Sequence, residues 1–155
     1  MPLAAVEFTS KAFGELTLDE LYAMLKLRAE VFVVEQQCTY LDPDGRDPGA
    51  QHLLGWSSDA SRALICGARV LKPGAIYEEA SIGRVVTSPA HRGTGLARQV
   101  MERALEECAR VYPEQPIRIE AQQYVERFYG SLGFVTVSEP FEEDGILHVM
   151  MLRPG

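Results

Sequence analysis

The sequence predicts an α/β fold in which a mixed central sheet is flanked by helices. Short apolar segments rich in Val and Ile alternate with segments of helical periodicity. A strand, a glycine-rich turn, a helix and a second strand follow one another in the middle of the chain, which is the order of a βαβ unit. The 155 residues, 46% of them hydrophobic and 24% charged, suffice for one globular domain with its own core. We therefore expect residues 1–155 to form a single domain.

Composition and charge exclude several classes of protein. The chain holds 15 Lys and Arg residues against 22 Asp and Glu residues, for a net charge of −7 and a pI near 5.0. This balance argues against nucleic acid or an anionic membrane as a partner, and it suits a cationic small substrate. The mean hydropathy is −0.07, no run approaches the ~18 apolar residues of a membrane helix, and residues 1–7 lack a basic segment before an apolar stretch. We expect a cytoplasmic protein with no membrane partner.

The cysteines and histidines give no sign of a metal site. The cysteines are Cys38, Cys66 and Cys108, and the histidines are His52, His91 and His148. Three cysteines cannot all pair, none has C-x-x-C spacing, and two lie in strongly apolar segments, so we expect small buried thiols in a reducing compartment. The histidines are far apart and have no cysteine close by, and we therefore predict no metal.

The first expected helix begins at a capping box formed by Thr17 and Glu20. Apolar residues then recur at helical spacing: Leu18, Leu21, Tyr22, Leu25, Ala29 and Phe32. Arg28 borders this stripe, where its guanidinium either extends to water or orients a loop or a carboxylate. Residues 38–48 then interrupt regular structure with an Asp-Pro-Asp-Gly turn.

Three strands are expected in the middle of the chain. Residues 51–56 and 63–71 read as two strands joined by a polar turn, and residues 81–87 read as a third, which ends at Ser88 and Pro89. The glycine-rich turn follows, and after it comes a long amphipathic helix. The apolar face of that helix is formed by Ala97, Val100, Met101, Ala104, Leu105 and Cys108.

The last third of the chain closes the predicted sheet. Residues 117–121 alternate as a strand, which we expect to run parallel to residues 81–87 through a right-handed crossover. A second helix is expected over residues 123–132, with Gly133 as its C-terminal stop. Its apolar face is formed by Tyr124, Phe128 and Leu132. Residues 134–137 and 146–152 read as two further strands, linked by an acidic turn.

The glycine-rich turn is the first motif that points to chemistry. Gly93 and Gly95 let backbone N–H groups approach a ligand at the positive end of the following helix, and Arg92 adds a charge at the entrance. This arrangement suits phosphate, although a plain strand-to-helix turn also uses glycine to reach positive φ. The P-loop pattern is absent, and Arg98 stands where a dinucleotide fingerprint needs a third small residue.

Three blocks of sequence together resemble a known superfamily. The blocks are Arg92-Gly93-Thr94-Gly95-Leu96-Ala97 after a strand, Phe128-Tyr129-Gly130-Ser131-Leu132-Gly133-Phe134 after a further strand, and Leu27-Arg28-Ala29-Glu30-Val31-Phe32-Val33-Val34-Glu35-Gln36 with Tyr40, Asp42 and Asp47 behind it. The first two resemble motifs A and B of the GNAT superfamily of acyl-CoA-dependent N-acetyltransferases. The third resembles the ElaA-like branch of bacterial GNAT proteins. The resemblance extends from about residue 8 to the C-terminus.

The resemblance implies acetyl-CoA as co-substrate and assigns it a place. Backbone groups of Val85, Val86 and Thr87 would hydrogen-bond the pantetheine amides and the acetyl oxygen. Backbone N–H groups after Arg92 would hold the pyrophosphate, and these belong to Gly93, Thr94, Gly95, Leu96 and Ala97.

The resemblance also implies two catalytic residues. Tyr129 matches the position that commonly protonates the departing thiolate, and the alternative is an aromatic residue that packs on the sheet. Glu120 is the candidate base at the end of its strand, and the alternative is an ordinary surface carboxylate. The wall of the acceptor pocket would come from a segment with four acidic residues: Glu35, Asp42, Asp44 and Asp47. These carboxylates would bind a cationic acceptor or relay its proton through water, and the alternative is a solvated acidic loop. Gln122 departs from the asparagine that many GNAT proteins have at its position.

The function implied is transfer of an acetyl group from acetyl-CoA to a primary amine, directly within a ternary complex. The acceptor would be a small molecule or a peptide, and a homodimer stays open. Two rivals remain. The first is an acyltransferase similar to acyl-homoserine-lactone synthases, which share an Arg-x-x-Val-Phe signature in the first helix. The second is a module that binds acyl-CoA without catalysis.

Overall fold

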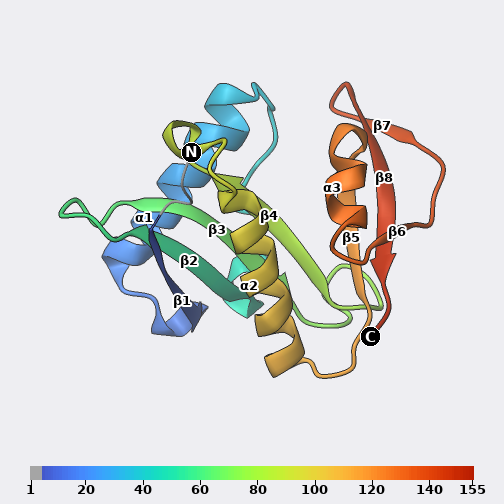
Figure 1. The fold of residues 1–155 in the computed structure, drawn as a ribbon, viewed down its shortest axis with the longest axis horizontal. Helices are drawn as coiled ribbons and strands as arrows, with labels where there is room; N and C mark the ends of the chain where they lie inside the picture. The colour runs from blue at the N-terminus through green and yellow to red at the C-terminus, as the bar shows by residue number, and fades with distance from the viewer. Residues whose placement is uncertain (1–4) are drawn as a thin grey trace.

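The computed structural model describes residues 5–155, which fold into two sheets with helices on their faces (Figure 1). The first sheet has four strands in the order β1-β2-β3-β4, and the second has the order β5-β8-β6, with β7 also paired to β8. The strands are β1 Val6–Ala12, β2 Gln51–Ser57, β3 Leu64–Leu71, β4 Ser81–Thr87, β5 Ile117–Gln122, β6 Val135–Thr136, β7 Phe141–Glu143 and β8 Ile146–Arg153. The α-helices are α1 Leu18–Arg28, which continues as a π-helix over Ala29–Glu35, α2 Leu96–Val111, and the short α3 Glu126–Gly130.

The predicted α/β class is confirmed, and the two sheets meet at one point. Neighbouring strands are antiparallel within each sheet, and β4 and β5 run parallel where Ala80 bridges to Ile117. There the amide of Arg118 donates to the carbonyl of Ala80 at 2.9 Å. We had expected a parallel pair along the whole of these strands. Instead they part after this bridge, and Figure 1 shows the second sheet turned away from the first.

Helices α1 and α2 cover opposite faces of the first sheet. Alternation along β4 decides which side chain meets which helix, because successive strand residues point to opposite faces. Val86 packs with Leu27 and Val31 of the α1 segment, whereas Val85 packs against the larger core cluster that contains α2. The α2 residues in that cluster are Leu96, Val100, Met101, Ala104 and Cys108. The predicted apolar face of this helix is confirmed except at Ala97, which is exposed while Leu96 is buried in its place.

Helix α1 begins where the sequence predicts but turns a different face to the core. The amide of Glu20 donates to Oγ1 of Thr17 at 3.1 Å, and the amide of Thr17 donates to Oε1 of Glu20 at 2.8 Å, which confirms the capping box. The predicted apolar stripe is wrong at Leu18 and Tyr22, which are 85% and 72% exposed, and at Ala29, which is also exposed. The buried residues are Met24, Leu27, Arg28 and Val31. The side of α1 that carries Arg28 therefore packs against the core.

The C-terminal third departs from the prediction in its details. The helix predicted over 123–132 is a 3₁₀ turn, Gln123–Val125, followed by the short α3, and Tyr124 is 76% exposed instead of packed. Two strands, β1 and β7, were not predicted, because their polar residues give no clean alternation.

Cys66 and Cys108 are buried as expected, while Cys38 is half-buried. Within residues 5–155, the helices are too short or too polar to span a bilayer.

Candidate active site

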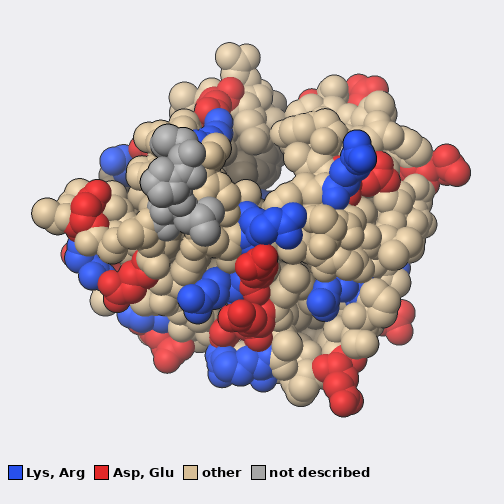
Figure 2. Space-filling view, in the orientation of Figure 1, with Lys and Arg blue, Asp and Glu red and all other residues tan. Residues whose placement is uncertain are grey.

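A continuous cleft opens where β4 and β5 part. It consists of two hollows of about 500 and 680 Å³. The smaller, which we call the β5 hollow, is lined by β5, the bulged part of β4, Tyr129 and the β7–β8 turn. The larger, which we call the glycine-turn hollow, is lined by the end of β4, the glycine-rich turn and the start of α2. The two hollows form one cleft, because both are lined by Val85, Phe32 and Tyr124. Figure 2 shows the surface hollowed between the first sheet and the second.

The predicted cofactor residues gather around the glycine-turn hollow. Its lining includes Val85, Val86, Thr87, Arg92, Gly93, Gly95, Leu96 and Ala97. Thr94 is not part of this lining, and its hydroxyl donates to the carbonyl of His91 at 2.7 Å, which closes the turn. Gly93 and Gly95 have φ values of 78° and 77°, a region that residues with a Cβ rarely adopt. The glycines therefore serve the turn itself and also leave the approach to the backbone open.

The start of α2 has the electrostatics of an anion site. Gly95 is the N-cap residue and has no side chain with which to cap the first-turn N–H groups of this 16-residue helix. These N–H groups carry the positive end of the helix dipole. The turn can therefore receive a phosphate group without any help from side chains.

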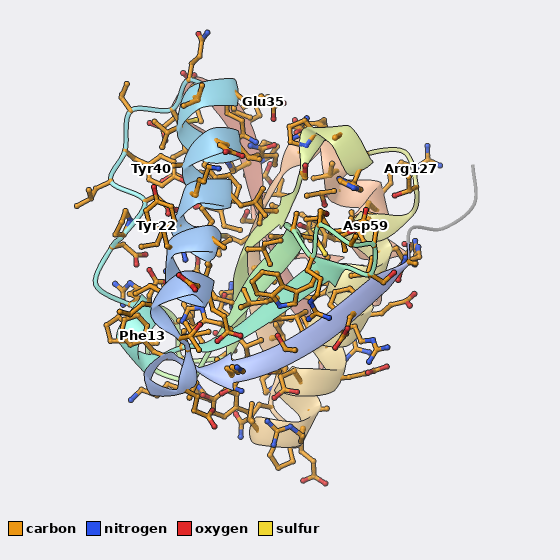
Figure 3. The ribbon with its side chains drawn as sticks, turned by 90° about the vertical axis from the view of Figure 1, so that its left-hand side faces the viewer. Phe13, Tyr22, Glu35, Tyr40, Asp59 and Arg127 are labelled. Carbon is orange, nitrogen blue, oxygen red and sulfur yellow. The ribbon has the colours of Figure 1, made fainter. Side chains whose placement is uncertain are left out.

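Arg92 has a partner that the sequence did not reveal. Its guanidinium donates to both carboxylate oxygens of Glu35, at 2.9 and 2.5 Å, and this hydrogen bonding raises the pKa of Arg92. Glu35 lies at the end of the long helical segment that begins as α1 (Figure 3). The sequence had suggested Glu35 for the acceptor wall. It lies instead beside the glycine-rich turn, where a bound phosphate would compete with it for Arg92.

A bulge in β4 exposes the backbone beside this hollow. Arg84 has a φ of 49°, and the register between β3 and β4 shifts between Gly67 and Arg69. Because a bulge leaves residues without ladder partners, it frees backbone groups for a ligand. Val85 follows Arg84 and lines both hollows, and the main-chain role implied for it stays a prediction.

Tyr129 lies on α3 and lines the β5 hollow. Its ring makes edge-on contacts with Phe128 and Phe134, with ring centroids 5.1 and 6.0 Å apart. Burial raises the pKa of the Tyr129 phenol, so the phenol keeps its proton at neutral pH. The ring therefore packs in the core while the residue borders the cleft, and its role as a proton donor stays a prediction.

Glu120 lies across the hollow in a cluster that the sequence did not predict. It is exposed between the buried Ile119 and Ala121, as the alternation of β5 requires. Carboxyl oxygens of Glu120 and Glu143 and a ring nitrogen of His148 all lie within 4.8 Å of one another. Partial desolvation of its carboxyl group in the hollow raises the pKa of Glu120 to about 7, and a hydrogen bond to Glu143 and the charges of Glu143 and Asp144 add to this. We call Glu120, Glu143 and His148 the glutamate–histidine cluster.

Sequence reasoning missed two members of this cluster for a topological reason. His148 was interpreted as isolated and residues 142–144 only as an acidic turn. In the structure β8 pairs with both β5 and β7, with Gln122 opposite His148 and Phe141 opposite His148. Carboxylates and imidazoles at such spacing also occur in divalent-cation sites. Only the spacing of the three groups favours a cation here, and the absence of a metal stays a prediction.

A second group of charges holds the loop before β2, and we call it the arginine–aspartate network. Arg28 donates to Asp42 at 2.8 Å and to Asp47 at 2.9 Å. Four further ion pairs complete the network: Arg69–Asp44 at 2.6 Å, Arg69–Asp47 at 3.1 Å, Arg84–Asp42 at 2.7 Å and Arg84–Asp44 at 3.4 Å. Of the two roles considered for Arg28, the structure shows that it orients the loop.

The network corrects the expectation for the acceptor wall. The three aspartates do not line the β5 hollow, because their carboxylates bind the arginines. The loop reaches the hollow through Cys38 and Tyr40 instead, and the Arg84 guanidinium lies 5.2 Å from the centre of the Tyr40 ring. The hydrogen bond from Arg69 holds the pKa of Asp44 well below its usual range.

Comparison with known proteins agrees with this geometry. The Acetyltransferase (GNAT) domain family matches residues 56–153. Protein ElaA of Escherichia coli (strain K12) is 43% identical over 150 residues, which are 96% of this chain and 96% of ElaA. The crystal structure of an acyl-CoA N-acyltransferase from Pseudomonas aeruginosa superposes with a TM-score of 0.89 at 42% identity, over 96% of this chain and 99% of that one.

A CoA-dependent acyl-homoserine lactone synthase shares the fold, with a TM-score of 0.77 at 18% identity over 96% of this chain and 82% of that one. Likeness at that identity shows the fold alone. The match of the domain family and the likeness to ElaA extend over the cleft, its glycine-rich turn and the strands that part around it. The chain therefore belongs to the GNAT family of acyltransferases, enzymes that take their acyl group from acyl-CoA, and within it to the ElaA-like branch.

Proposed function

We propose that residues 1–155 form a single N-acetyltransferase domain that moves an acetyl group from acetyl-CoA to a primary amine within a ternary complex, in the bacterial cytoplasm. One observation carries the proposal: a single cleft joins the uncapped start of α2 to Tyr129 and Glu120. The cofactor would lie along the glycine-turn hollow with its thioester at the β4 bulge. The amine would enter through the β5 hollow.

Each chemical requirement of the transfer has a candidate group in the cleft. An ammonium must lose a proton before it can attack, and Glu120, with its pKa raised to about 7, is a suitable acceptor at neutral pH. Charge then develops on the carbonyl oxygen, and backbone N–H groups near Val85 would stabilise it. The thiolate leaves last, and Tyr129 would protonate it.

The charge of the β5 hollow supports a cationic acceptor. Glu120, Glu143 and Asp144 line it, and the Arg84 guanidinium, which also lines it, is paired with Asp42. A protonated amine of a small molecule or a peptide is favoured there, and a nucleic acid is disfavoured. We see no specific feature that favours lactone synthesis or binding without catalysis.

Replacement of Tyr129 by Phe tests the mechanism. Tyr129→Phe keeps the ring contacts and deletes the proton donor, so kcat with acetyl-CoA and a panel of amines should fall by about 10²-fold while the affinity for acetyl-CoA changes little. An acyl donor with a more acidic thiol should recover part of the loss. Tyr112→Phe is the matched control, because Tyr112 packs against the same core away from the cleft. If Tyr129→Phe keeps the full kcat, Tyr129 does not protonate the thiolate and its ring serves only to pack in the core.

The thermal stability of the complex tests where the cofactor binds. Acetyl-CoA at ~100 times its Kd should stabilise the native protein by about 2.7 kcal/mol. Gly95→Val should abolish the increase in Tm, because a branched side chain would block the backbone at the start of α2. Gly74→Val is the control for backbone strain, since Gly74 also has a positive φ, 87°, and lies in a loop outside both hollows. If Gly95→Val and the wild type respond equally to acetyl-CoA, the phosphate site lies elsewhere.

A further inference from the structure

We propose that the β7–β8 hairpin completes the catalytic base: Glu143 keeps Glu120 basic enough to take the proton of a cationic amine, and His148 carries that proton onward to solvent. This inference rests on the proposed transfer to an amine and adds two positioning residues to it. Glu143 and His148 lie outside the two sequence blocks, 92–97 and 128–134, that resemble motifs A and B. The side chains of Glu120, Glu143 and His148 come from three different strands.

Strand pairing brings the three groups together. Glu120 is opposite Met150 and Gln122 is opposite His148, so the side chains of Glu120 and His148 lie two ladder steps apart on neighbouring strands. Phe141 pairs with His148 on the other side of β8, and Glu143 ends β7 at the turn. The result is the spacing of at most 4.8 Å among the three groups. Any two of them are thus close enough for a direct or a water-bridged hydrogen bond.

The orientation of the His148 ring suits a proton relay. Its Nδ1 lies 2.8 Å from the carbonyl oxygen of Ile146, which can only accept, so Nδ1 carries a hydrogen and donates it. In the neutral ring Nε2 then has the free lone pair and is the atom that accepts a proton. The ring of Phe141 stacks on the imidazole at 6.0 Å and 23°, which fixes its plane.

Among residues 5–155, the titratable groups that face Glu120 are two carboxyl groups, an imidazole and a phenol. Glu143 and Asp144 come from the β7–β8 turn, His148 from β8, and the Tyr77 phenol from the loop before β4. Burial raises the pKa of Tyr77, and the charges of Glu120 and Glu143 add to this. Arg118 lies two residues before Glu120, but its guanidinium is bound to Glu79 at 3.0 and 3.1 Å. Because no arginine or lysine of the described part of the chain pairs with its carboxylate, Glu120 is a stronger base than an ordinary glutamate.

The proton balance of the step is complete. The ammonium gives one proton to the Glu120 carboxylate, and the freed nitrogen lone pair forms the C–N bond with the acetyl carbonyl. The C–S bond then breaks, the thiolate takes the Tyr129 proton, and the second proton lost by the nitrogen returns to the Tyr129 oxygen. The proton on Glu120 passes to Nε2 of His148 and from there to water. The products are the amide, CoA with its thiol protonated, and one proton in solution.

Carboxyl NMR of the whole protein, labelled with ¹³C at glutamate, tests the role of Glu143 without a substrate. The wild type should show one glutamate with a pKa of about 7. Glu143→Gln should lower that pKa, because the repelling charge is gone and an amide can donate to the carboxylate, while the contribution of burial remains. Glu142→Gln is the matched control: it removes the same charge from the next residue of β7, which is exposed and faces the other side of the strand. An ordinary Glu120 pKa in the wild type, or no change in Glu143→Gln, overturns the proposal.

Steady-state kinetics test the relay. In the wild type kcat/KM should rise with pH through about 7, and in Glu143→Gln this limb should move to lower pH with a lower plateau. His148→Ala should lower kcat by about tenfold with little change in KM, and added imidazole should restore part of it. No rescue and an unchanged limb would make the hairpin merely structural. If the NMR result is as expected but no amine in the panel is acetylated, the proposed function fails while the coupling of Glu120 to Glu143 stands.

Discussion

The protein contains two clusters of carboxylates that differ in what surrounds them. In the arginine–aspartate network, three aspartates meet three arginines, and Arg28, Asp42, Asp47 and Arg69 are each at most 5% exposed. In the glutamate–histidine cluster, two glutamates meet one histidine at the open edge of the cleft. The network holds the pKa of Asp44 well below its usual range through the hydrogen bond from Arg69, while burial and Glu143 raise the pKa of Glu120 to about 7.

The difference separates a structural use of charge from a chemical one. A carboxylate bound by a guanidinium stays ionised at all ordinary pH values and can neither take nor give a proton at neutral pH. Such a group serves to hold structure in place and not to transfer protons. Here the network connects the loop before β2 to α1, β3 and β4. A carboxylate without a cation, close to a second carboxylate, exchanges its proton near neutral pH and is suited to acid–base catalysis.

The largest expected effect follows from breaking the network. Arg28→Ala would leave Asp42 and Asp47 buried with one arginine fewer, and we expect the free energy of unfolding to fall by about 3–5 kcal/mol. Denaturation by urea measures it. The control is Lys26→Ala in the same helix, which removes an exposed pair with Glu30 at 3.8 Å and should cost at most about 0.5 kcal/mol.

Arg28→Lys sharpens this first prediction. It keeps the charge but loses the planar fork that reaches Asp42 and Asp47 together, so its cost should lie between those of the other two variants. If Arg28→Ala is no more costly than Lys26→Ala, the network does not hold the loop.

Local sequence signals were sufficient for most of the fold. The capping box at Thr17, the apolar face of α2 and the alternation of β5 each depend on residues within a few positions of one another, and all three are confirmed, apart from Ala97 in α2. The same local logic misplaced the core face of α1. Leu18 and Tyr22 look buried by spacing, but the core needs the side that carries Arg28, since the ion pairs with the distant loop lie there.

The sequence predicted candidate site residues mainly where they lie together in one contiguous motif. The glycine-rich turn and Tyr129 lie in contiguous motifs, and both line the cleft. Glu143 and His148 could not be linked to Glu120, because the link is the pairing of β8 with strands on either side of it. The partner of Arg92 was missed for a similar reason, since Glu35 is 57 residues earlier in the chain.

A smaller but sizeable effect follows from removing the base. Glu120→Gln should lower turnover of an amine at neutral pH by about 10²-fold, the lower end of what a positioned base contributes. The defect should shrink at high pH, because the amine then loses its proton to solvent. Turnover measured from pH 6 to 10 decides between this and a defect that is constant with pH, which would indicate a structural or binding role. Glu142→Gln serves again as the control of equal charge.

The smallest expected effect concerns stability, and here the two clusters should act with opposite sign. The pKa of Asp44 is lowered in the folded protein by Arg69, so this carboxylate contributes stability that is present above its unfolded pKa of 3.8 and is lost as the pH falls. The pKa of Glu120 is raised from 4.5 to about 7. Between these values the folded protein binds a proton that the unfolded chain releases, so stability falls as the pH rises through this window. Glu120→Gln should therefore stabilise the protein at pH 8 and leave it unchanged at pH 4.

Exposure limits the size of this last effect. Glu120 lies at the open side of the cleft, and solvent screens its repulsion from Glu143, so we expect a gain of about 1 kcal/mol or less at pH 8. For a chain of this length that corresponds to an increase in Tm of about 2–4 °C at most. Thermal denaturation of the wild type, Glu120→Gln and Glu142→Gln at both pH values measures it. Loss of stability in Glu120→Gln at pH 8 would mean that the glutamate holds the fold, and the contrast between the two clusters would then disappear.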